Sequence, residues 1–430
     1  MDTIAQVVSD GLCTGCGTCA GMCPSGAVRM HISDGVYLPK IEWQKCSRCG
    51  VCATSCPGYS VDFKRLNSTV FGKQPENMLI GNFLRCYVGH SNDESIRYNS
   101  SSGGLATEIL IFALNEGIID GALVVRMRKD NPLEPEPFIA KTRKEVIHAS
   151  KSKYCPVALN EALKQILERE GKFAVVGLPC HIQGIRKAEA VSKKLQKRIV
   201  FHIGLMCSHA ITFTGVEFLL EKLHIKKEQV AKLDYRGKGW PGSMTVQTKN
   251  HESSNIPLIG GWNAYWPIFS SFFFAPIRCM MCSDQTNEFS DVSLGDAWLP
   301  ELKYEKSGES VVVTRTKIAE NVIARMNAAK LISMRSLSLE KVVFSQSSNL
   351  QFKKDDLVSR LQVLKWFGLE IPRFAPELDF SDSSMSYLRA LFPYFSILAS
   401  SNSHIRSILL RVPFPLFRLY YGLYKFLSSV

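Results

Sequence analysis

"CTGCGTCAGMCP" at residues 13–24 and "CSRCGVCATSCP" at residues 46–57 hold eight of the fourteen cysteines of this 430-residue chain. Both stretches have the spacing C-x2-C-x2-C-x3-C-P. In paired stretches of this kind, three closely spaced thiolates bind one iron–sulfur cube, and the fourth, which precedes proline, binds the other cube. The repeat therefore predicts two 4Fe–4S clusters, the first held by Cys13, Cys16, Cys19 and Cys56 and the second by Cys46, Cys49, Cys52 and Cys23.

Zinc is the alternative for so many cysteines. Paired C-x2-C units form zinc ribbons, but those use two cysteines per knuckle and lack the evenly spaced third one. The segment from residue 8 to about residue 60 resembles a bacterial-type ferredoxin, with a short hairpin expected around Asp34 and Gly35. Because the chain continues far beyond this segment, we expect the two clusters to serve a downstream part.

The composition is that of a globular protein with more than one domain. Hydrophobic residues make up 46% of the chain and charged residues 21%, and 430 residues exceed one ordinary core. The formal net charge of +13 predicts attraction to an acidic partner, an anionic cofactor or an anionic membrane surface. No motif of a nucleic-acid-binding module accompanies this charge, so no nucleic-acid partner is expected.

The first residues, "MDTIAQVVSDGLCTGC", lack the charged and apolar regions of a signal peptide. No uninterrupted apolar run reaches the length of a membrane span. Many cysteines without an export signal favour metal binding over disulfide bonds. We therefore expect a cytoplasmic protein.

An α/β pattern begins after the cysteine repeat. "CYVGH" at residues 86–90 and "GALVV" at residues 121–125 predict strands, and "GGLATEILIFALNEG" at residues 103–117 predicts a helix between them. The serines and glycines of residues 100–104 therefore lie at a helix start, where free amides and hydroxyls form an anion site. An ordinary serine N-cap explains the same residues equally well.

Four further cysteines are candidates for a third cluster. Cys180 follows the expected strand 173–176 in a sharp turn, and Cys207 follows another strand, so both lie at the edge where open α/β sheets bind ligands. Cys279 and Cys282 form a C-x2-C pair. Lone cysteines are more often small buried apolar residues, but two at strand ends and a close pair together favour a metal site.

The remaining cysteines and the titratable side chains receive weaker assignments. Cys86 begins an apolar strand and is expected in the core, whereas Cys155 competes for a ligand position. No catalytic residue is assigned. The candidate proton donors, for which ordinary packing or turn roles are the usual explanation, are His181, His202, His209 and Asp296.

Six motifs in order carry a resemblance to a known family: "SSGG", "SKSKY", "GLPCHIQGIRK", "GLMCSH", "DYRGKGWPG" and "RCMMCSDQTNEFSDVSLGDAW". Over residues 1 to about 350 the chain resembles the coenzyme F420 hydrogenase/dehydrogenase beta-subunit family, in its form with an N-terminal ferredoxin. The resemblance implies an FAD-containing module that passes electrons between a 4Fe–4S cluster and a flavin. It also implies a third cluster on Cys180, Cys207, Cys279 and Cys282 and an FAD site lined by Ser101, Ser102, Gly103, Gly104 and Lys153.

Three departures from the family pattern bear on the substrate more than on the cofactors. His181 and Leu178 stand where relatives often have glutamine and threonine, and Cys155 stands where another residue is usual. The helix start at 100–104 and the basic loop at 151–153 offer the amides and cations that a pyrophosphate needs. No G-x-G-x-x-G follows a strand, so a Rossmann-type dinucleotide site is not expected.

The expected fold is an α+β ferredoxin-like N-terminal domain, an α/β flavin and iron–sulfur domain, and a helical C-terminal tail. The first domain covers residues 1–65. The α/β domain has an N-terminal part at 80–160 and a C-terminal part with the third cluster at 161–350. The helical basic tail covers 351–430.

The tail has an unusual charge pattern. After Asp382 it contains no acidic residue, while arginine and lysine alternate with phenylalanine, leucine, isoleucine and tyrosine. Two roles are open: an amphipathic contact with an anionic membrane surface, or a helix that docks on the main domain. The expected location is therefore cytoplasmic, with membrane association as an alternative for the tail.

The expected function is that of a flavin- and iron–sulfur-dependent oxidoreductase. Ferredoxin or another redox protein supplies electrons to the front clusters, and the third cluster and FAD pass them to F420 or another small organic acceptor. The alternative is an electron-transfer subunit of a larger oxidoreductase complex, without a substrate site of its own. A redox sensor is a weaker alternative, since the sequence contains no evident DNA-binding or signalling segment.

Overall fold

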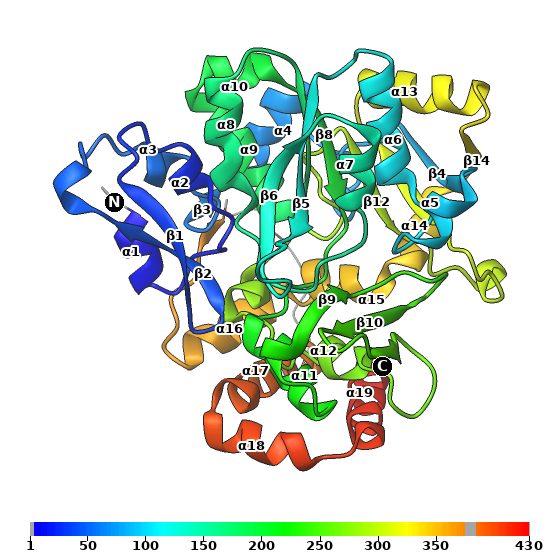
Figure 1. The fold of residues 1–430 in the computed structure, drawn as a ribbon. Coiled ribbons are helices and arrows are strands. Elements are labelled where there is room, and N and C mark those ends of the chain that lie inside the picture. The colour runs from blue at the N-terminus through cyan, green and yellow to red at the C-terminus, as the bar shows by residue number, and fades with distance from the viewer. Residues whose placement is uncertain (1–3, 375–383, 430) are drawn as a thin grey trace.

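The computed structural model describes residues 4–374 and 384–429. A small N-terminal unit, blue in Figure 1, is built around the hairpin of β1 and β2. Asp34 and Gly35 form its turn with φ angles of 51° and 74°, the left-handed pair that a two-residue hairpin prefers, so the expected hairpin is confirmed. The elements of the unit and its distant strand partner are α1 Ile4–Ser9, α2 Thr18–Gly21, β1 Val28–Ser33, β2 Val36–Ile41, α3 Val51–Thr54, β3 Ser60–Val61 and β15 Arg373–Phe374.

An eight-stranded mixed sheet forms the centre of the molecule (Figure 1). Its strand order is β14-β4-β13-β12-β8-β7-β5-β6, in which β12, β8, β7 and β5 run parallel. Antiparallel strands continue the sheet on both sides of these four. The strands are β4 Arg85–Ser91, β5 Gly121–Met127, β6 Pro135–Ala140, β7 Phe173–Gly177, β8 Ile199–Leu205, β12 Val292–Asp296, β13 Ser310–Thr314 and β14 Ile332–Ser336.

Helices cover both faces of this sheet. The central strands carry apolar side chains on both faces, since successive residues point to opposite sides, and both faces must therefore be buried. In β7, Ala174 contributes to the core beneath α6 and α13, whereas Phe173 and Val175 contribute to the core beneath α8 and α9. The arrangement is therefore a three-layer α/β/α fold. The helices around the sheet are α4 Phe63–Phe71, α5 Glu94–Tyr98, α6 Leu105–Asn115, α7 Arg143–His148, α8 Leu163–Glu168, α9 Pro179–Val191, α10 Lys193–Arg198 and α13 Lys317–Ala328.

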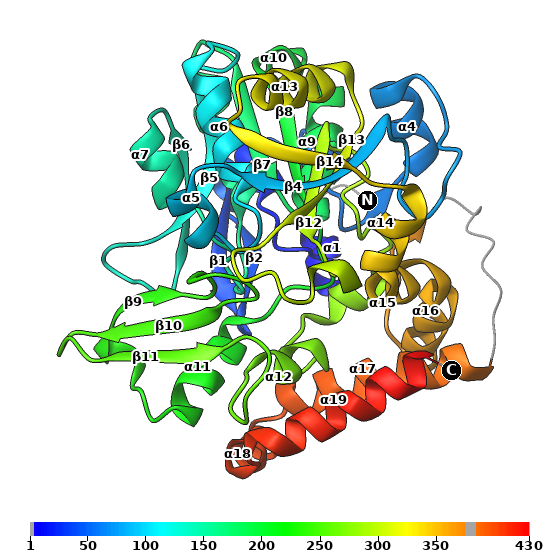
Figure 2. The ribbon, with the colours of Figure 1, turned by 90° about the vertical axis from the view of Figure 1, so that its right-hand side faces the viewer.

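A smaller antiparallel sheet of order β11-β10-β9 lies beside the main sheet. The tail helices α17, α18 and α19 gather at the end of the molecule below it in Figure 1, and α19 runs along that end in Figure 2. No helix in the described ranges is long and apolar enough to cross a membrane. The elements here are β9 Val230–Asp234, β10 Ser243–Thr248, β11 Ser253–Pro257, α11 Phe213–Lys222, α12 Trp266–Ser270, α14 Leu339–Ser345, α15 Ser347–Leu350, α16 Leu357–Trp366, α17 Ser384–Ser401, α18 Ser403–Arg411 and α19 Phe414–Ser429.

Helix α9 joins the N-terminal unit to the main domain. Gly184 of α9 lies so close to the unit that a Cβ there would be 2.2 Å from Oγ1 of Thr18. Asn160 fastens the same contact, because its Nδ2 donates to Oγ1 of Thr18 at 2.8 Å and its amide donates to the carbonyl of Cys16 at 2.9 Å. The first group of cysteines is thereby held directly against α9.

Two cations of the main domain bond to carbonyls of the N-terminal unit. Lys187, in the next turn of α9, donates to the carbonyl of Cys56 at 2.6 Å. Arg278 donates to the carbonyl of Leu12 at 3.0 Å and to that of Gly58 at 3.1 Å. These bonds satisfy carbonyls that the docking removes from water, which would otherwise be costly.

Most of the expected elements are present, but the expected position of Cys180 was wrong. The strands expected at 86–90, 121–125 and 173–176 and the helix expected at 103–117 are found. Cys180 does not lie in a turn: Pro179 starts helix α9, so Cys180 is in its first turn. The parts expected at 80–160 and 161–350 contribute strands to one sheet and share its cores.

Replacing Gly184 by alanine is expected to loosen the N-terminal unit, because the added Cβ meets the buried Thr18 and Asn160. Overpacking of this kind destabilises a protein by about 1–3 kcal/mol. The thermal midpoint should fall, and limited proteolysis should release the N-terminal unit faster. Gly422→Ala is the matched control, since Gly422 is also helical but has no atom within 4 Å of the added Cβ. Unchanged proteolysis in the Gly184 variant would contradict the tight docking.

Candidate functional site

The first three cysteines and Cys56 form one group around α2. Burial raises the pKa of the Cys13 thiol to about 12, and the neighbouring thiolates of Cys16 and Cys56 add to the rise. Burial and the same neighbours also raise the pKa of Cys19. The amide of Gly15 points at Sγ of Cys13 from 3.4 Å. With raised pKa values, the thiols of Cys13 and Cys19 require a cationic centre to become thiolate ligands at neutral pH.

The other four cysteines of the repeat form a second group nearer the surface. Cys23, Cys46, Cys49 and Cys52 line one small hollow, and Cys49 is exposed. The structure thus brings Cys23 of the first stretch to three cysteines of the second stretch. Cys52 lies within electrostatic range of Cys19, so the two groups are neighbours.

The third group assembles from three parts of the main domain. Cys180 is in the first turn of α9, Cys207 follows β8, and Cys279 and Cys282 lie in and just after a short 3-10 helix. Burial raises the pKa of Cys180, and the next contributions come from Cys16, Cys207, Cys282 and Cys279. The structure therefore brings the four expected cysteines together and sets them beside Cys16 of the first group.

The thiols of these groups do not form a compact single-ion site. Across residues 4–374 and 384–429, no three histidine, cysteine, aspartate or glutamate side chains are arranged to hold one metal ion. Thiolates that bind a cube lie at its corners and are separated by the cube itself. The preference for iron–sulfur cubes over lone zinc ions rests on the cysteine spacing of the repeat.

Cationic side chains surround the third group. Lys353 is 1% exposed, and its charge counteracts the rise that burial causes in the pKa values of Cys207 and Cys279. For Cys282, burial is again the largest influence, but Lys353 and weaker contributions together outweigh it and lower the pKa of the thiol. Lys354 pairs with Glu288 at 2.5 Å, whereas no ion pair of Lys353 occurs in the described part of the chain.

Arg360 adds a second buried cation near these thiols. Burial lowers the pKa of its guanidinium to about 10, and the nearby Cys282 acts in the opposite direction. It donates to the carbonyl of Cys282 at 3.2 Å and to the carbonyl of Met280. Sequence reasoning missed Lys353 and Arg360, because neither belongs to a motif. In the structure Lys353 lies in the π-helical turn Gln351–Asp355.

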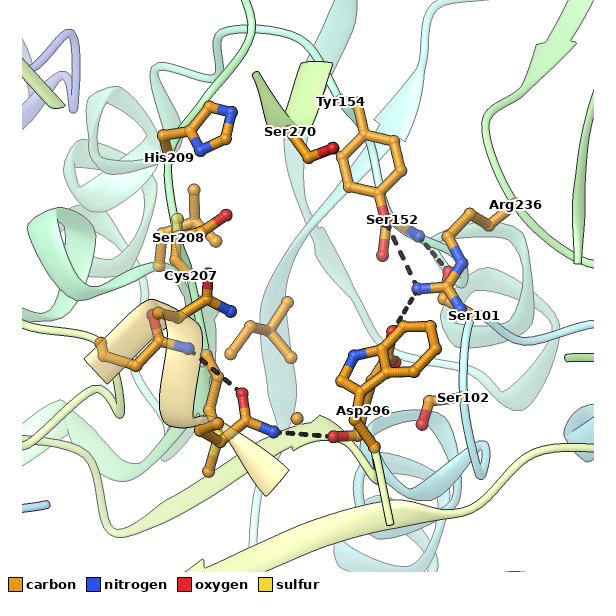
Figure 3. Close-up of a pocket in the computed structure, with 18 of the residues that line it drawn as sticks. Ser101, Ser102, Ser152, Tyr154, Cys207, Ser208, His209, Arg236, Ser270 and Asp296 are labelled. Atoms are coloured by element: carbon orange, nitrogen blue, oxygen red, sulfur yellow. Dashed lines mark hydrogen bonds and ion pairs between the residues drawn. The ribbon is translucent and has the colours of Figure 1, made fainter. Parts of the chain in front are cut away.

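A cavity of about 1440 Å³ opens where the parallel strands of the main sheet end. Its walls include residues at the carboxyl ends of β7, β8 and β12, the loop 151–155 and part of α19. Figure 3 shows Cys207, Ser208 and His209 on one side and Arg236, Tyr154 and Ser101 on the other. Cys207 therefore faces two places: the third cysteine group and the cavity.

The expected FAD residues lie at or behind this cavity. Ser101, Ser102 and Gly104 line it, but Gly103 does not, and a Cβ at Gly103 would be 2.6 Å from the carbonyl of Gly89. Gly104, with φ of 78°, occupies the N-cap of α6. The simple serine N-cap that the sequence allowed is therefore wrong. The serine hydroxyls bond elsewhere: Oγ of Ser101 accepts from the amide of Ser152 at 2.7 Å, and Ser102 donates to the carbonyl of Glu309 at 2.7 Å.

Lys153 touches the cavity, but its ammonium is turned toward its own backbone. It donates to the carbonyls of Ser150 at 2.7 Å and Lys151 at 2.9 Å, and also to that of Ala149 at the end of α7. Burial lowers the pKa of Lys153 to about 7. Its role as an FAD contact stays a prediction, and the structure gives it a structural role in shaping the loop.

Arg236 is a cavity residue that sequence reasoning did not single out, although it lies in the quoted "DYRGKGWPG". Its Nη1 donates to Asp296 at 2.7 Å and to the hydroxyl of Tyr154 at 3.3 Å (Figure 3). Its Nη2 is buried without a hydrogen-bond partner among the described residues. A buried donor of this kind fits an anionic group of a bound ligand, since leaving it unpaired is costly.

The candidate proton donors fall into different environments. His181 is locked as a neutral ring between the amide of Leu178 at 3.1 Å and the carbonyl of Val157 at 3.0 Å, and burial lowers its pKa to about 4. His209 lines the cavity; burial lowers its pKa to about 4, and its Nδ1 has no partner among the described residues. The geometry assigns none of them to a proton transfer.

His202 lies in a buried ion cluster instead. It contacts Glu189 at 2.8 Å and Asp291 at 3.0 Å, and these carboxylates raise its pKa against the effect of burial and Arg186. Cys86 is buried in the core beside β13, as expected. Cys155 is buried in the core of the smaller sheet, where burial raises its pKa to about 12, and the thiols that influence Cys180 do not include it.

Three family models match the chain. Residues 12–61 match the 4Fe-4S dicluster domain. Residues 86–164 match the N-terminal model, and residues 170–340 the C-terminal model, of the coenzyme F420 hydrogenase/dehydrogenase beta subunit. The tail lies beyond all three matches.

Several relatives are similar to this chain in sequence. The coenzyme F420 hydrogenase subunit beta of Methanothermobacter thermautotrophicus is 27% identical over 303 residues, which are 69% of this chain and 100% of that protein. One subunit of the F(420)H(2) dehydrogenase of Methanosarcina mazei is 27% identical over 74% of this chain and 83% of its own length. The coenzyme F420-dependent sulfite reductase of Methanocaldococcus jannaschii is 26% identical over 81% of this chain, but over only 51% of that protein.

A solved structure has a similar fold. It is a chain of the F420-reducing NiFe hydrogenase complex from Methanosarcina barkeri, with a TM-score of 0.53 and 21% identity. The alignment covers 70% of this chain and 99% of that chain.

Proposed function

The chain belongs to the coenzyme F420 hydrogenase/dehydrogenase beta-subunit family, and from that premise we propose that it is an iron–sulfur flavoprotein oxidoreductase. It takes electrons from a ferredoxin-type donor through three 4Fe–4S clusters to FAD and on to a small organic acceptor. The observation that carries this proposal is the order of the cysteine groups in space. The exposed Cys49 marks one end of the series, and Cys207 at the cavity wall marks the other.

Adjacent groups meet at identifiable cysteines. The second group approaches the first where Cys52 lies near Cys19, and the first approaches the third where Cys16 lies near Cys180. The repeat would hold two clusters with exchanged fourth ligands, and the third group would hold another. Because adjacent groups are neighbours, the three clusters would form one electron-transfer path from the protein surface to the cavity.

The surface around the second group suits an acidic donor protein. Lys45 and Arg48 flank Cys46 and are exposed, with Lys45 paired to Glu42 at 2.5 Å, and Trp43 beside them is 53% exposed. Basic and aromatic side chains around an exposed redox centre favour a transient complex with an acidic redox protein. Ferredoxin is a donor of this class.

The cavity supports FAD as the bound group. Its volume of about 1440 Å³ exceeds the roughly 300–1,000 Å³ of ordinary small-molecule sites, so it has room for a dinucleotide and an acceptor. Ser101 and Ser102 would contact the cofactor, and the unpaired Nη2 of Arg236 would bond its pyrophosphate. FAD, when bound, exchanges single electrons with clusters and electron pairs with organic molecules. F420 is one acceptor, by analogy with the named relatives.

A second function is favoured by the names of the relatives, several of which are subunits. In that case this chain would carry electrons within a larger oxidoreductase complex and would have no substrate site of its own. The size of the cavity favours the first function.

The two functions are separated by turnover of the purified, FAD-loaded chain with reduced ferredoxin and F420 or other acceptors. We expect steady-state acceptor reduction without a partner subunit, because the cavity has room for an acceptor beside the cofactor. Rising ionic strength should slow the reaction through weaker donor binding, and Lys45→Glu with Arg48→Glu should slow it further, whereas Lys330→Glu on a distant surface should not. Rapid cluster reduction without any acceptor turnover would support the electron-transfer subunit.

Iron and flavin content test the cofactors directly. Anaerobically purified protein should contain about twelve irons, from three 4Fe–4S clusters, and one FAD per chain. Cys180→Ser combined with Cys279→Ser should lower the iron content to about eight while the front clusters keep their spectra. The matched control is Cys86→Ser, which removes a buried thiol that lies outside the groups and does not line the cavity. Zinc, or eight irons without flavin in the unsubstituted protein, would contradict the proposal.

We expect the positive charge of Lys353 to raise the reduction potential of the third cluster without binding the cluster. A buried positive charge favours the more negative, reduced state of a cluster. Lys353→Met should therefore lower the midpoint potential, followed by electron paramagnetic resonance, by on the order of 60 mV, which corresponds to a tenfold change in a one-electron equilibrium. Lys353→Arg should retain most of the potential, and Lys365→Met on the exposed side of α16 should have no effect. An unchanged potential in Lys353→Met would refute this role.

A further inference from the structure

The tail helices are docked on the main domain, yet they also expose large apolar side chains. On the inner side, Phe417 of α19 and Tyr394 of α17 are 3% and 5% exposed. Tyr420 and Tyr424 of α19 stack on Phe392 with ring centroids 4.3 and 5.0 Å apart. The docking that the sequence left as one alternative is therefore present.

The outer side of these helices carries an apolar surface, which we call the tail face. In α19, Leu416, Leu419, Leu423 and Phe426 are between 51% and 69% exposed. Their spacing of three and four residues places them on one stripe of the helix, next to the buried stripe of Phe417, Tyr420 and Tyr424. The tail face consists of these four residues of α19, and Phe395 in α17 and Ile408 in α18 are exposed apolar residues of the neighbouring helices.

The joint between α18 and α19 is held firmly. Lys222 of α11 donates to the carbonyls of Leu410 at 3.1 Å and Val412 at 2.5 Å. Its ammonium also lies over the ring of Phe414 at 5.0 Å. These contacts hold α18 and α19 in place at the end of the molecule that lies at the bottom of Figures 1 and 2.

The charges within the tail have one sign. From residue 383 to residue 430 the sequence has no aspartate or glutamate. Arg389 is neutralised by Asp356 at 2.8 Å, whereas Arg411, Arg418 and Lys425 are exposed. An apolar helix surface whose own helices carry cations and no acidic residue matches the boundary of an anionic bilayer, where apolar side chains enter the acyl region and cations meet the headgroups.

We propose that the tail face docks this protein onto an anionic lipid surface as a peripheral membrane contact. The helices would lie in the interface, because none in the described ranges can span the bilayer. Arg418 and Lys425 also line the cavity, so the membrane would lie beside the cavity rim. This inference uses neither the clusters nor the flavin and does not depend on the proposed redox function.

Vesicle co-sedimentation of the full, cofactor-loaded chain tests the proposal. Vesicles of phosphatidylcholine with phosphatidylglycerol should bind the protein, and vesicles of phosphatidylcholine alone should bind it much less. Leu419→Glu with Leu423→Glu should weaken partitioning by about tenfold or more, because each substitution removes an inserted leucine and adds a repelled charge. Arg411→Gln with Lys425→Gln should weaken binding to the anionic vesicles only.

The matched control is Tyr304→Glu, in which a glutamate replaces a large side chain that is 80% exposed and lies outside the tail. It should leave vesicle binding unchanged. Iron content and the thermal midpoint of every variant show whether it is folded. The absence of binding to anionic vesicles, or equal losses in the tail and Tyr304 variants, would overturn the proposal. So would a dimer in vesicle-free solution that Leu419→Glu with Leu423→Glu dissociates while lipid binding stays unchanged, since the tail face would then bind a second copy.

Discussion

Close contact between helix α9 and the N-terminal unit is the constraint on which the arrangement depends. Gly184 lets the backbone of α9 come within a side chain's width of Thr18, and the first turn of the same helix carries Cys180. Because one rigid helix bears both the contact and the thiol, the position of the first cysteine group relative to the third is determined by packing. Lys187, on that helix, bonds to the carbonyl of Cys56 and completes the joint.

Buried thiols can serve as thiolate ligands only if nearby positive charge offsets the free energy of burying their negative charge. In Cys13, Cys56 and Cys180, loss of water raises the pKa and favours the neutral thiol. Lys353 and Arg360 supply positive charge around the third group, and both come from the segment that follows the last family-model match. The segment after residue 340 therefore contributes positive charge beside cysteines that lie far earlier in the sequence.

The cavity follows from the topology of the main sheet. Parallel neighbours β7, β8 and β12 end at one edge, so Cys207 and Asp296 both line the cavity there although many residues separate them in the sequence. The smaller sheet contributes Arg236 by way of the turn after β9, and α19 covers part of the opening. Because three separate regions build the walls, no single stretch of sequence describes the site.

The sequence by itself determined the cysteine repeat, the hairpin at Asp34 and Gly35, the central strands and the family, because each depends on local spacing or on motifs in order. It placed Cys180 in a turn and allowed serine N-caps before α6, whereas the structure shows a helix start and a glycine N-cap. Lys153 lines the cavity as expected of an FAD contact, and its ammonium bonds to its own backbone, which the sequence did not indicate. Tertiary structure alone decided that Cys16 meets Cys180, that Lys353 faces the thiols and that Arg236 keeps an unpaired donor in the cavity. These are contacts between residues far apart in the chain, and only the packing of complete helices and strands brings such residues together.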